Sequence, residues 1–269
     1  MLSLHTNVAS LSTQNSLGST NKALTSSMTK LGTGYRVNSA LDDAAGLQIA
    51  TRLNAQTRGM QVAQKNTQNA ISMIQTAEGG LSELSNMLLR MKDLATEAAT
   101  ETASTADKAA LSMEYVEVLK EAKNILTNTK FGDKKLLDAA ASWSIQTGAG
   151  NTEQYAVTAS AVDLNTTITT ADITTAANAK TAIGQLDTAI AAVGTTRSQF
   201  GAAANVLENM FNNLGNMIQN TSAAKGRIMD VDYAAETSNM AKQQMVMQAS
   251  TSMLKQSNSM SQMIGSLLQ

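Results

Sequence analysis

Two adjacent carboxylates, Asp42 and Asp43, lie in the stretch LGTGYRVNSALDDAAGLQIATRL, residues 31–53. Such a pair could bind a metal, act as acid and base, or begin a helix. Adjacent side chains on a helix diverge by about 100°, so the two carboxylates could not share one metal ion there. We therefore expect acidic groups that complement the positive end of a helix, with Ser39 or Asp42 as the N-cap.

Other groups that could do chemistry are scarce. The chain has no cysteine, and its one histidine is His5. Most nucleophilic triads and transition-metal sites are therefore unavailable. Met240 and Met247 lie one heptad apart, but the next heptad position is Leu254, which favours packing over a row of copper ligands. The sequence thus predicts no enzyme, no catalytic residue, no cofactor and no metal site.

The composition excludes several partners. With 20 basic and 21 acidic residues among 269, the net charge is −1, and no basic face suggests nucleic acid. The apolar stretches are too short to span a membrane. The N-terminus has no basic start followed by an apolar run, so we expect no Sec-type signal peptide. Aromatics make up only 3% and proline is absent, which favours closely packed, unbroken helices.

Two long helices should hold the chain together. In the last third, apolar residues step 3-4-3-4 in the manner of a coiled-coil seam about 50 Å long. The positions are Ile183, Leu186, Ile190, Val193, Arg197, Phe200, Ala204, Leu207, Phe211, Leu214 and Ile218. The first half has a matching strip, on a helix that begins near Asp42 and extends about 80 Å. Its positions are Ala70, Ile74, Ala77, Leu81, Leu84, Leu88, Met91, Ala95 and Ala98.

A third helix follows a polar connector, with its start at Ser104, Thr105 or Asp107. Its predicted apolar positions are Leu111, Tyr115, Val118, Ala122 and Ile125. We expect these three helices to form an elongated antiparallel coiled-coil bundle, so that the fold is mainly α.

The middle of the chain has a different pattern. Residues 142–160 alternate in polarity around Trp143 and Tyr155, with the turn-forming TGAGN between them, which predicts a β-hairpin. The Thr-rich residues after it indicate an extended surface connection. We therefore expect three parts: residues 1–41 plus 225–269, residues 42–140 plus 176–224, and a small β-hairpin region over 141–175.

Both ends show diluted one-sided helical patterns. Residues 1–31 carry Leu4, Val8, Leu11, Leu17, Leu24, Met28 and Leu31, and the last stretch carries Val246, Ala249, Met253, Met260, Met263 and Leu267. Alone in water, such helices are marginal because their apolar face lacks a cover. We expect each end to pair with the other end or with another molecule.

The opening stretch resembles the N-terminal signature of bacterial flagellins, L-S-S-G-x-R-I-N-S-A-x-D-D-A-A-G-x-x-I-A. The C-terminal part is similar to the same family in its RI-x-D-x-DYA-x-E core, Arg227–Glu236, and in its terminal SLL, residues 266–268. The likeness covers about the first 140 and the last 90 residues. It implies a subunit of the flagellar filament, exported unfolded and polymerised at the filament tip, outside the cell.

The resemblance also implies roles for particular residues. Its paired ends would form the polymerisation domain, with assembly residues Arg36, Asn38, Asp42, Asp43, Gly46, Arg227, Asp230, Tyr233, Leu267 and Leu268. Recognition by Toll-like receptor 5 would use Arg90, Leu94 and Glu114. Implied partners are further copies of the chain, an export chaperone, and the cap and junction proteins.

Three other classes of protein fit the sequence less well than a filament subunit. The hook–filament junction protein has similar ends, but the unbroken DYA-x-E and SLL signatures and the short middle favour flagellin. A coiled-coil signalling module would need a membrane span or a longer rod. An enzyme would need groups that the sequence lacks.

Overall fold

The computed structural model describes residues 7–137 and 141–267. The chain divides into two compact units. We call residues 56–219 the rod unit and residues 1–55 with 220–269 the terminal unit. Within the described residues, no helix combines the length and the hydropathy that crossing a bilayer requires.

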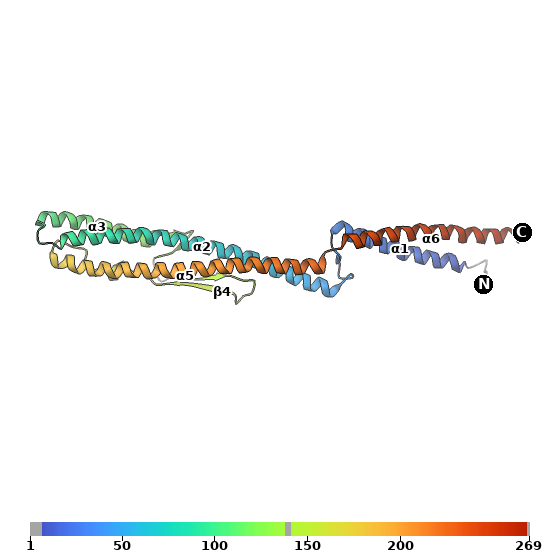
Figure 1. Ribbon diagram of the computed structural model, residues 1–269, viewed down its shortest axis with the longest axis horizontal. Coiled ribbons are helices and arrows are strands. Elements are labelled where there is room, and N and C mark those ends of the chain that lie inside the picture. The colour runs from blue at the N-terminus through green and yellow to red at the C-terminus, as the bar shows by residue number, and fades with distance from the viewer. Residues whose placement is uncertain (1–6, 138–140, 268–269) are drawn as a thin grey trace. The chain divides into compact units, whose positions relative to one another are not determined.

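Three helices form the rod unit and lie side by side (Figure 1). They are α2 (Ala44–Ala98), α3 (Thr105–Asn128) and α5 (Ala176–Met229), of which α2 and α5 continue into the terminal unit. The pairs Lys92–Asp187 and Glu78–Arg197 show that α5 runs antiparallel to α2. The Arg90–Glu114 pair, with only a short connector between α2 and α3, shows the same for α3. The predicted antiparallel helical bundle is therefore confirmed.

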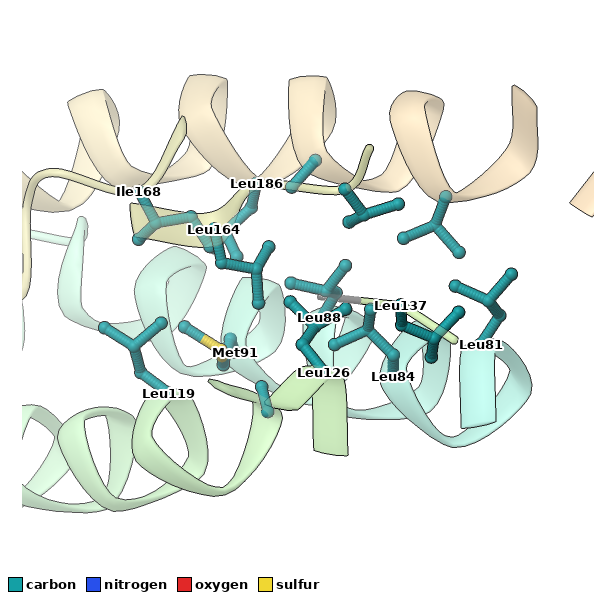
Figure 2. Close-up of a cluster of buried hydrophobic side chains, with 14 of the residues drawn as sticks. Leu81, Leu84, Leu88, Met91, Leu119, Leu126, Leu137, Leu164, Ile168 and Leu186 are labelled. Atoms are coloured by element: carbon teal, nitrogen blue, oxygen red, sulfur yellow. The ribbon is translucent and has the colours of Figure 1, made fainter. Parts of the chain in front are cut away.

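The apolar strip predicted on α2 forms the centre of this bundle. All nine of its positions are buried. Leu84 and Leu88 belong to one buried cluster with Leu126 of α3 and Leu186 of α5 (Figure 2). Because the strip keeps a strict three-and-four spacing, α2 presents one continuous face to both neighbours.

On α5 and α3 some predicted core positions are wrong by one residue. At every second position, the buried residue is a direct neighbour of the predicted one in the sequence. Leu186, Val193 and Phe200 are buried as predicted, but the residues between them in the buried row are small. These are Ala182, Ala189, Thr196 and Ala203, whereas Ile183, Ile190, Arg197 and Ala204 are only half-buried. On α3, similarly, Ser112, Leu119 and Leu126 are buried in place of Leu111, Val118 and Ile125. On α5 the alternate buried positions carry small side chains, and larger side chains flank that line.

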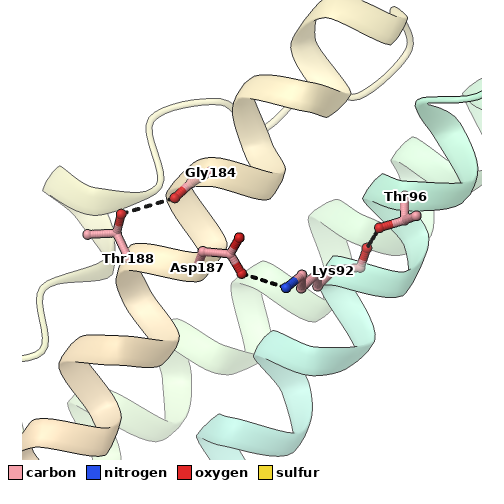
Figure 3. Close-up of polar contacts among 5 residues, drawn as sticks. All are labelled: Lys92, Thr96, Gly184, Asp187 and Thr188. Carbon is pink, nitrogen blue, oxygen red and sulfur yellow. Dashed lines mark hydrogen bonds and ion pairs between the residues drawn. The ribbon is translucent and has the colours of Figure 1, made fainter.

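Polar pairs fix the alignment of α2 against α5. The Lys92 ammonium lies 2.6 Å from the Asp187 carboxylate (Figure 3). About three turns further along α5, Arg197 donates to Glu78 at 2.7 Å. Arg197 and Glu78 are half-buried, and one Glu78 oxygen has no partner within the described chain. A shift of one helix along the other would separate both pairs, so they favour one register.

The start of α3 is a capping box. The Ser104 hydroxyl accepts from the Asp107 amide, and the Asp107 carboxylate accepts from the Ser104 amide. Ser104 was one of the three predicted starts, and it is the N-cap. The bonds also lower the pKa of Asp107, the side-chain bond from Ser104 contributing most.

The predicted β-hairpin is present and lies on the rod. Strands β3 (Ala141–Gln146) and β4 (Gln154–Ala159) pair antiparallel, with Trp143 opposite Val157. The Trp143 ring stacks on Phe200 of α5, with centroids 5.6 Å apart and the planes 6° from parallel. At the tip, Ala149 lies so close to Gly59 of α2 that a Cβ there would come within 2.7 Å of the Ala149 Cβ. The hairpin is thus held at both ends.

Two features of the middle segment differ from the prediction. A tight hairpin of β1 (Lys130–Phe131) and β2 (Lys134–Lys135), with Gly132 at φ 59°, was not predicted. The Thr-rich connection is not a surface segment, because Leu164, Ile168 and Ile173 are buried in the core and residues Leu164–Thr167 form the short helix α4. Their irregular spacing matches neither a helix nor a strand period, which hid them in the sequence.

The terminal unit contains the paired end helices α1 (Val8–Thr33) and α6 (Tyr233–Leu267). Asn7, the N-cap of α1, donates to Ser257 near the end of α6, and Tyr35 pairs with Asp230 near its start. The two helices therefore pair, as predicted, and they run antiparallel. Their Cα atoms come within 8 Å of each other, so the two helices pack side by side.

Candidate functional site

Small polar side chains, rather than the predicted apolar stripe, join α1 to α6. The buried residues of α1 are Ser10, Thr20, Leu24 and Ser27, and Ser250 is buried on α6. Ser10 donates to Asn258, and Asn7 bonds Ser257 at 3.1 Å. Small residues permit the close approach, but among the described residues of α1 only Leu24 adds a large buried apolar group. The seam is therefore weakly hydrophobic.

Apart from Leu24, most of the large apolar side chains of both helices lie outside this seam. On α1, Leu11 is 56% exposed, and on α6 Met253 is 67% exposed. Other exposed members are Val8, Met28, Met245, Val246, Met260 and Met263. Pairing of the two ends therefore leaves most of these apolar side chains uncovered, which favours the other expected partner, another molecule. An exposed apolar row of this extent is typical of an interaction surface.

Arg36 ties the segment after α1 to the end of α5. Its backbone N–H donates to the Met229 carbonyl at 2.6 Å, and its guanidinium donates to the Ile228 carbonyl at 2.7 Å. These are carbonyls of the last turn of α5, which an arginine satisfies while it complements the negative helix end. Val231 returns a bond to the Gly34 carbonyl. Arg227 lies in the same last turn of α5.

Asp42 organises the turn before α2 rather than capping the helix. Its carboxylate accepts from the amides of Asn38 and Ser39, at 3.0 and 2.8 Å, and from the Ser39 hydroxyl. The Asn38 side chain donates to the Tyr35 carbonyl, which closes the turn. The backbone bonds, that from Ser39 first, lower the pKa of Asp42 because they stabilise the charged form.

Asp43 is the N-cap residue of α2. Its Oδ1 accepts from the Gly46 amide at 2.8 Å, the third residue of the helix. The expected cap at Ser39 or Asp42 is therefore corrected to Asp43. Gly46 is part of the cap, since a Cβ there would lie 2.3 Å from the Asp43 Oδ2. Any larger residue at 46 would displace the carboxylate.

The start of α6 uses the same device, which the sequence prediction missed. Asp232 accepts from the amides of Ala234 and Ala235, at 2.9 and 3.2 Å. An aspartate directly before an alanine-rich helical run was the available signal. Next to it, Tyr233 places its hydroxyl 3.0 Å from where a Cβ of Gly34 would be, and Gly34 has φ 75°. Glycine alone fits that position without strain.

The remaining predicted assembly residues are Asp230, Leu267 and Leu268. Asp230 follows α5, and its amide donates to the Gly226 carbonyl at 2.8 Å. Leu267 is the last residue of α6, and Leu268 lies outside the described residues. Arg36, Asn38, Asp42, Asp230 and Tyr233 come together in one connector between the end helices and the adjoining turns of α2 and α5.

The three predicted receptor residues do not share one surface. Arg90 of α2 and Glu114 of α3 form an exposed ion pair, whose side-chain bond raises the pKa of Arg90. Leu94 is only 1% exposed and lies in the rod core. Within this chain it is a packing residue, so a direct contact to it would require the rod to open.

Metal ligands are not grouped in the described chain. Among residues 7–137 and 141–267, no three histidine, aspartate or glutamate side chains cluster as a metal site would require. The carboxylates that sequence analysis singled out each accept backbone hydrogen bonds, in the turn or at the helix start.

Asp42 makes the connector sensitive to acid. Since its pKa in the folded chain lies below the ordinary value of 3.8, its stabilisation is present above that value and is lost as the pH falls through the lowered pKa. We expect the protection factors of the Asn38 and Ser39 amides, which are exchange rates corrected for the intrinsic effect of pH, to fall there, measured by NMR from pH 6 to 2. The Asp42→Asn variant should lose that step; an unchanged step would exclude Asp42 as its cause.

Comparisons with known proteins agree with these features. Family models for the bacterial flagellin N-terminal and C-terminal helical regions match residues 4–142 and 183–268. A flagellin of Halalkalibacterium halodurans is 40% identical over 90% of each chain. A flagellin of Bacillus subtilis is 36% identical, over 97% of this chain and 98% of that one.

A solved structure shows the same arrangement. The crystal structure of Bacillus cereus flagellin matches with a TM-score of 0.50 and 35% identity, over 56% of this chain and 88% of that one. The matches cover both end regions and the helical rod. The chain therefore belongs to the bacterial flagellin family and is a structural subunit of the flagellar filament.

Proposed function

We propose that the chain is exported unfolded, aided by an export chaperone, and polymerises at the filament tip through the exposed apolar rows of α1 and α6. The supporting observation is the exposure of these rows while small polar residues form the α1–α6 seam. A surface that meets a different surface on the next copy produces an open helical polymer. Contacts with the cap and junction proteins would use the same ends.

The weak seam supports a further part of this proposal, which is that neighbouring copies order the end helices. Burying a large apolar side chain contributes about 1.5–3 kcal/mol, and α1 buries only Leu24 in the pair. Ordering each residue of a helix costs about 1–2 kcal/mol of backbone entropy. Covering Leu11, Met253 and their neighbours in the filament would offset that cost.

A charge on the exposed row tests the assembly surface. We expect Leu11→Asp to raise the critical concentration for polymerisation by about tenfold or more, because burying the row would then desolvate a carboxylate. Asn151→Asp, which adds the same charge at the exposed hairpin turn, should assemble normally. Sedimentation of seeded samples measures both. Normal assembly of the Leu11→Asp chain would refute the proposed surface.

A second proposal concerns innate recognition. We propose that Toll-like receptor 5 binds the rod around Arg90 and Glu114, with Leu94 supporting them from the core. The exposed ion pair favours this, because charged groups on a rigid helix pair are well positioned for a partner. The affinity of the receptor for this surface would also depend on the neighbouring residues, which here include Lys92 and Asp93.

Receptor recognition can be tested without altering the rod. Arg90→Ala should lower receptor signalling by about tenfold while helix content stays unchanged, because Arg90 lies off the apolar core. Lys120→Ala, at another exposed cation of the rod, is the matched control and should signal normally. Equal signalling by the two variants would remove Arg90 from the proposed site.

A further inference from the structure

Three methionines lie together on one exposed face of α6. Met245, Met253 and Met260 are 63%, 67% and 50% exposed. At about 100° per residue, Met253 and Met260 lie about 80° and 60° around the helix from Met245, so the three thioethers share one stripe. Ser250 and Ser257, which face α1, lie on the neighbouring side, at about 140° and 120°.

Their position makes these sulfur atoms the reactive part of the exposed row. Met60, Met73 and Met91 are buried in the rod, where the protein shields them from solutes. A thioether reacts with peroxides according to its accessibility, and leucine in the same place would not react. The stripe therefore combines an apolar surface with a site of oxidation.

We propose that Met245, Met253 and Met260 form a peroxide-sensitive modification site that switches off assembly of the free subunit. The step transfers one oxygen atom from hydrogen peroxide to each thioether. The O–O bond breaks, an S–O bond forms, the sulfur loses two electrons, and the peroxide leaves as water. Methionine sulfoxide reductases reverse the modification.

The consequence follows from the change in polarity. A sulfoxide is polar and accepts hydrogen bonds, so its burial against another apolar surface costs free energy where the thioether gained it. Only the free chain would be vulnerable, because assembly would cover the stripe. This site rests on the proposed assembly function of the same face.

The experiment compares assembly before and after oxidation. Purified chain is treated with hydrogen peroxide until mass spectrometry shows full conversion of the three methionines, and seeded polymerisation is then measured. We expect the critical concentration to rise about tenfold, and methionine sulfoxide reductase to restore it. The chain with Met245→Leu, Met253→Leu and Met260→Leu should regain most of its assembly after the same treatment, since of the exposed stripe only Met263, which is 56% exposed, is then still oxidised.

A matched control separates this stripe from exposed methionine in general. Met113 on α3 is 68% exposed, and the Met113→Leu chain should remain as sensitive as the natural one. If the triple variant fails to assemble untreated, the three single Met→Leu variants replace it, each expected to lose part of the sensitivity.

Two results would overturn the site. Undiminished assembly of the oxidised natural chain, or equal sensitivity of the leucine variants, refutes the oxidation site and leaves the assembly surface intact. Failure of the untreated natural chain to polymerise refutes the assembly surface, and the oxidation site with it.

Discussion

A chain that ends at Ser252 is expected to form no filaments. The deletion removes Met253 and Met260 from the exposed row, together with Ser257 and Asn258, which bond the start of α1. Each large side chain that the filament covers contributes about 1.5–3 kcal/mol. Losing two of them should raise the critical concentration for polymerisation about a hundredfold or more. At concentrations where the full chain polymerises, the truncated chain should therefore remain monomeric.

The truncated chain should nevertheless stay folded as a monomer. The buried members of the rod core that the structure describes all lie within residues 70–207, so the deletion removes none of them. Circular dichroism should therefore show a helical, soluble protein, and electron microscopy after seeding should show no filaments. Full-length Met253→Leu, which keeps an apolar side chain in the row, is the control and should assemble. Long filaments from the truncated chain would show that the end of α6 is dispensable.

Phe200→Ala should be among the most damaging substitutions in the rod. Phe200 is buried on α5 and stacks on Trp143 of the hairpin. Truncating a buried phenylalanine costs about 3–5 kcal/mol, and the lost ring stacking adds to that. Urea unfolding should move to a correspondingly lower midpoint. Phe131→Ala, at a partly exposed phenylalanine of β1, is expected to change the free energy of unfolding far less.

Tryptophan fluorescence gives a second measurement on the Phe200→Ala variant. Trp143 is the single tryptophan of the chain, so its fluorescence describes the hairpin alone. Loss of the Phe200 ring should expose Trp143 and shift its emission to longer wavelength before the rod unfolds. An unshifted emission together with unchanged stability would mean that the hairpin is not anchored at Phe200.

Strong periodicity made much of the rod predictable. The strip from Ala70 to Ala98 repeats without interruption, and it matches the buried face of α2 at every position. Ser104 and Asp107 have the residue types of a capping box, and they form one. Where local propensity, spacing and tertiary packing agree, sequence reasoning is reliable.

Close packing of small residues was harder to predict. On α5, Ile183 and Ile190 are larger than Ala182 and Ala189, so a hydrophobic pattern favours the isoleucines. The buried positions are the alanines, because helices approach most closely where side chains are small. The same cause misled the prediction for the ends, where Ser10, Thr20 and Ser27 join α1 to α6 and Leu11 stays exposed.

The connector was predictable in part. Resemblance selected Arg36, Asn38 and Asp42, and the structure places them in one hydrogen-bonded turn beside the end of α5. Which of the two neighbouring carboxylates caps α2 was not predictable, since Asp42 and Asp43 have the same side chain. Only the backbone path decides that Asp42 closes the turn while Asp43 caps α2.

Amide hydrogen exchange on the dilute free chain and on assembled filaments tests the account most directly. If neighbouring copies supply the ordering, residues 8–33 and 233–260 should exchange rapidly in the solitary chain and slowly in the filament. Residues 70–98 and 179–207 of the rod should be protected in both. Slow exchange of the end helices in the dilute chain, at the level of the rod, would contradict the dependence on neighbouring subunits.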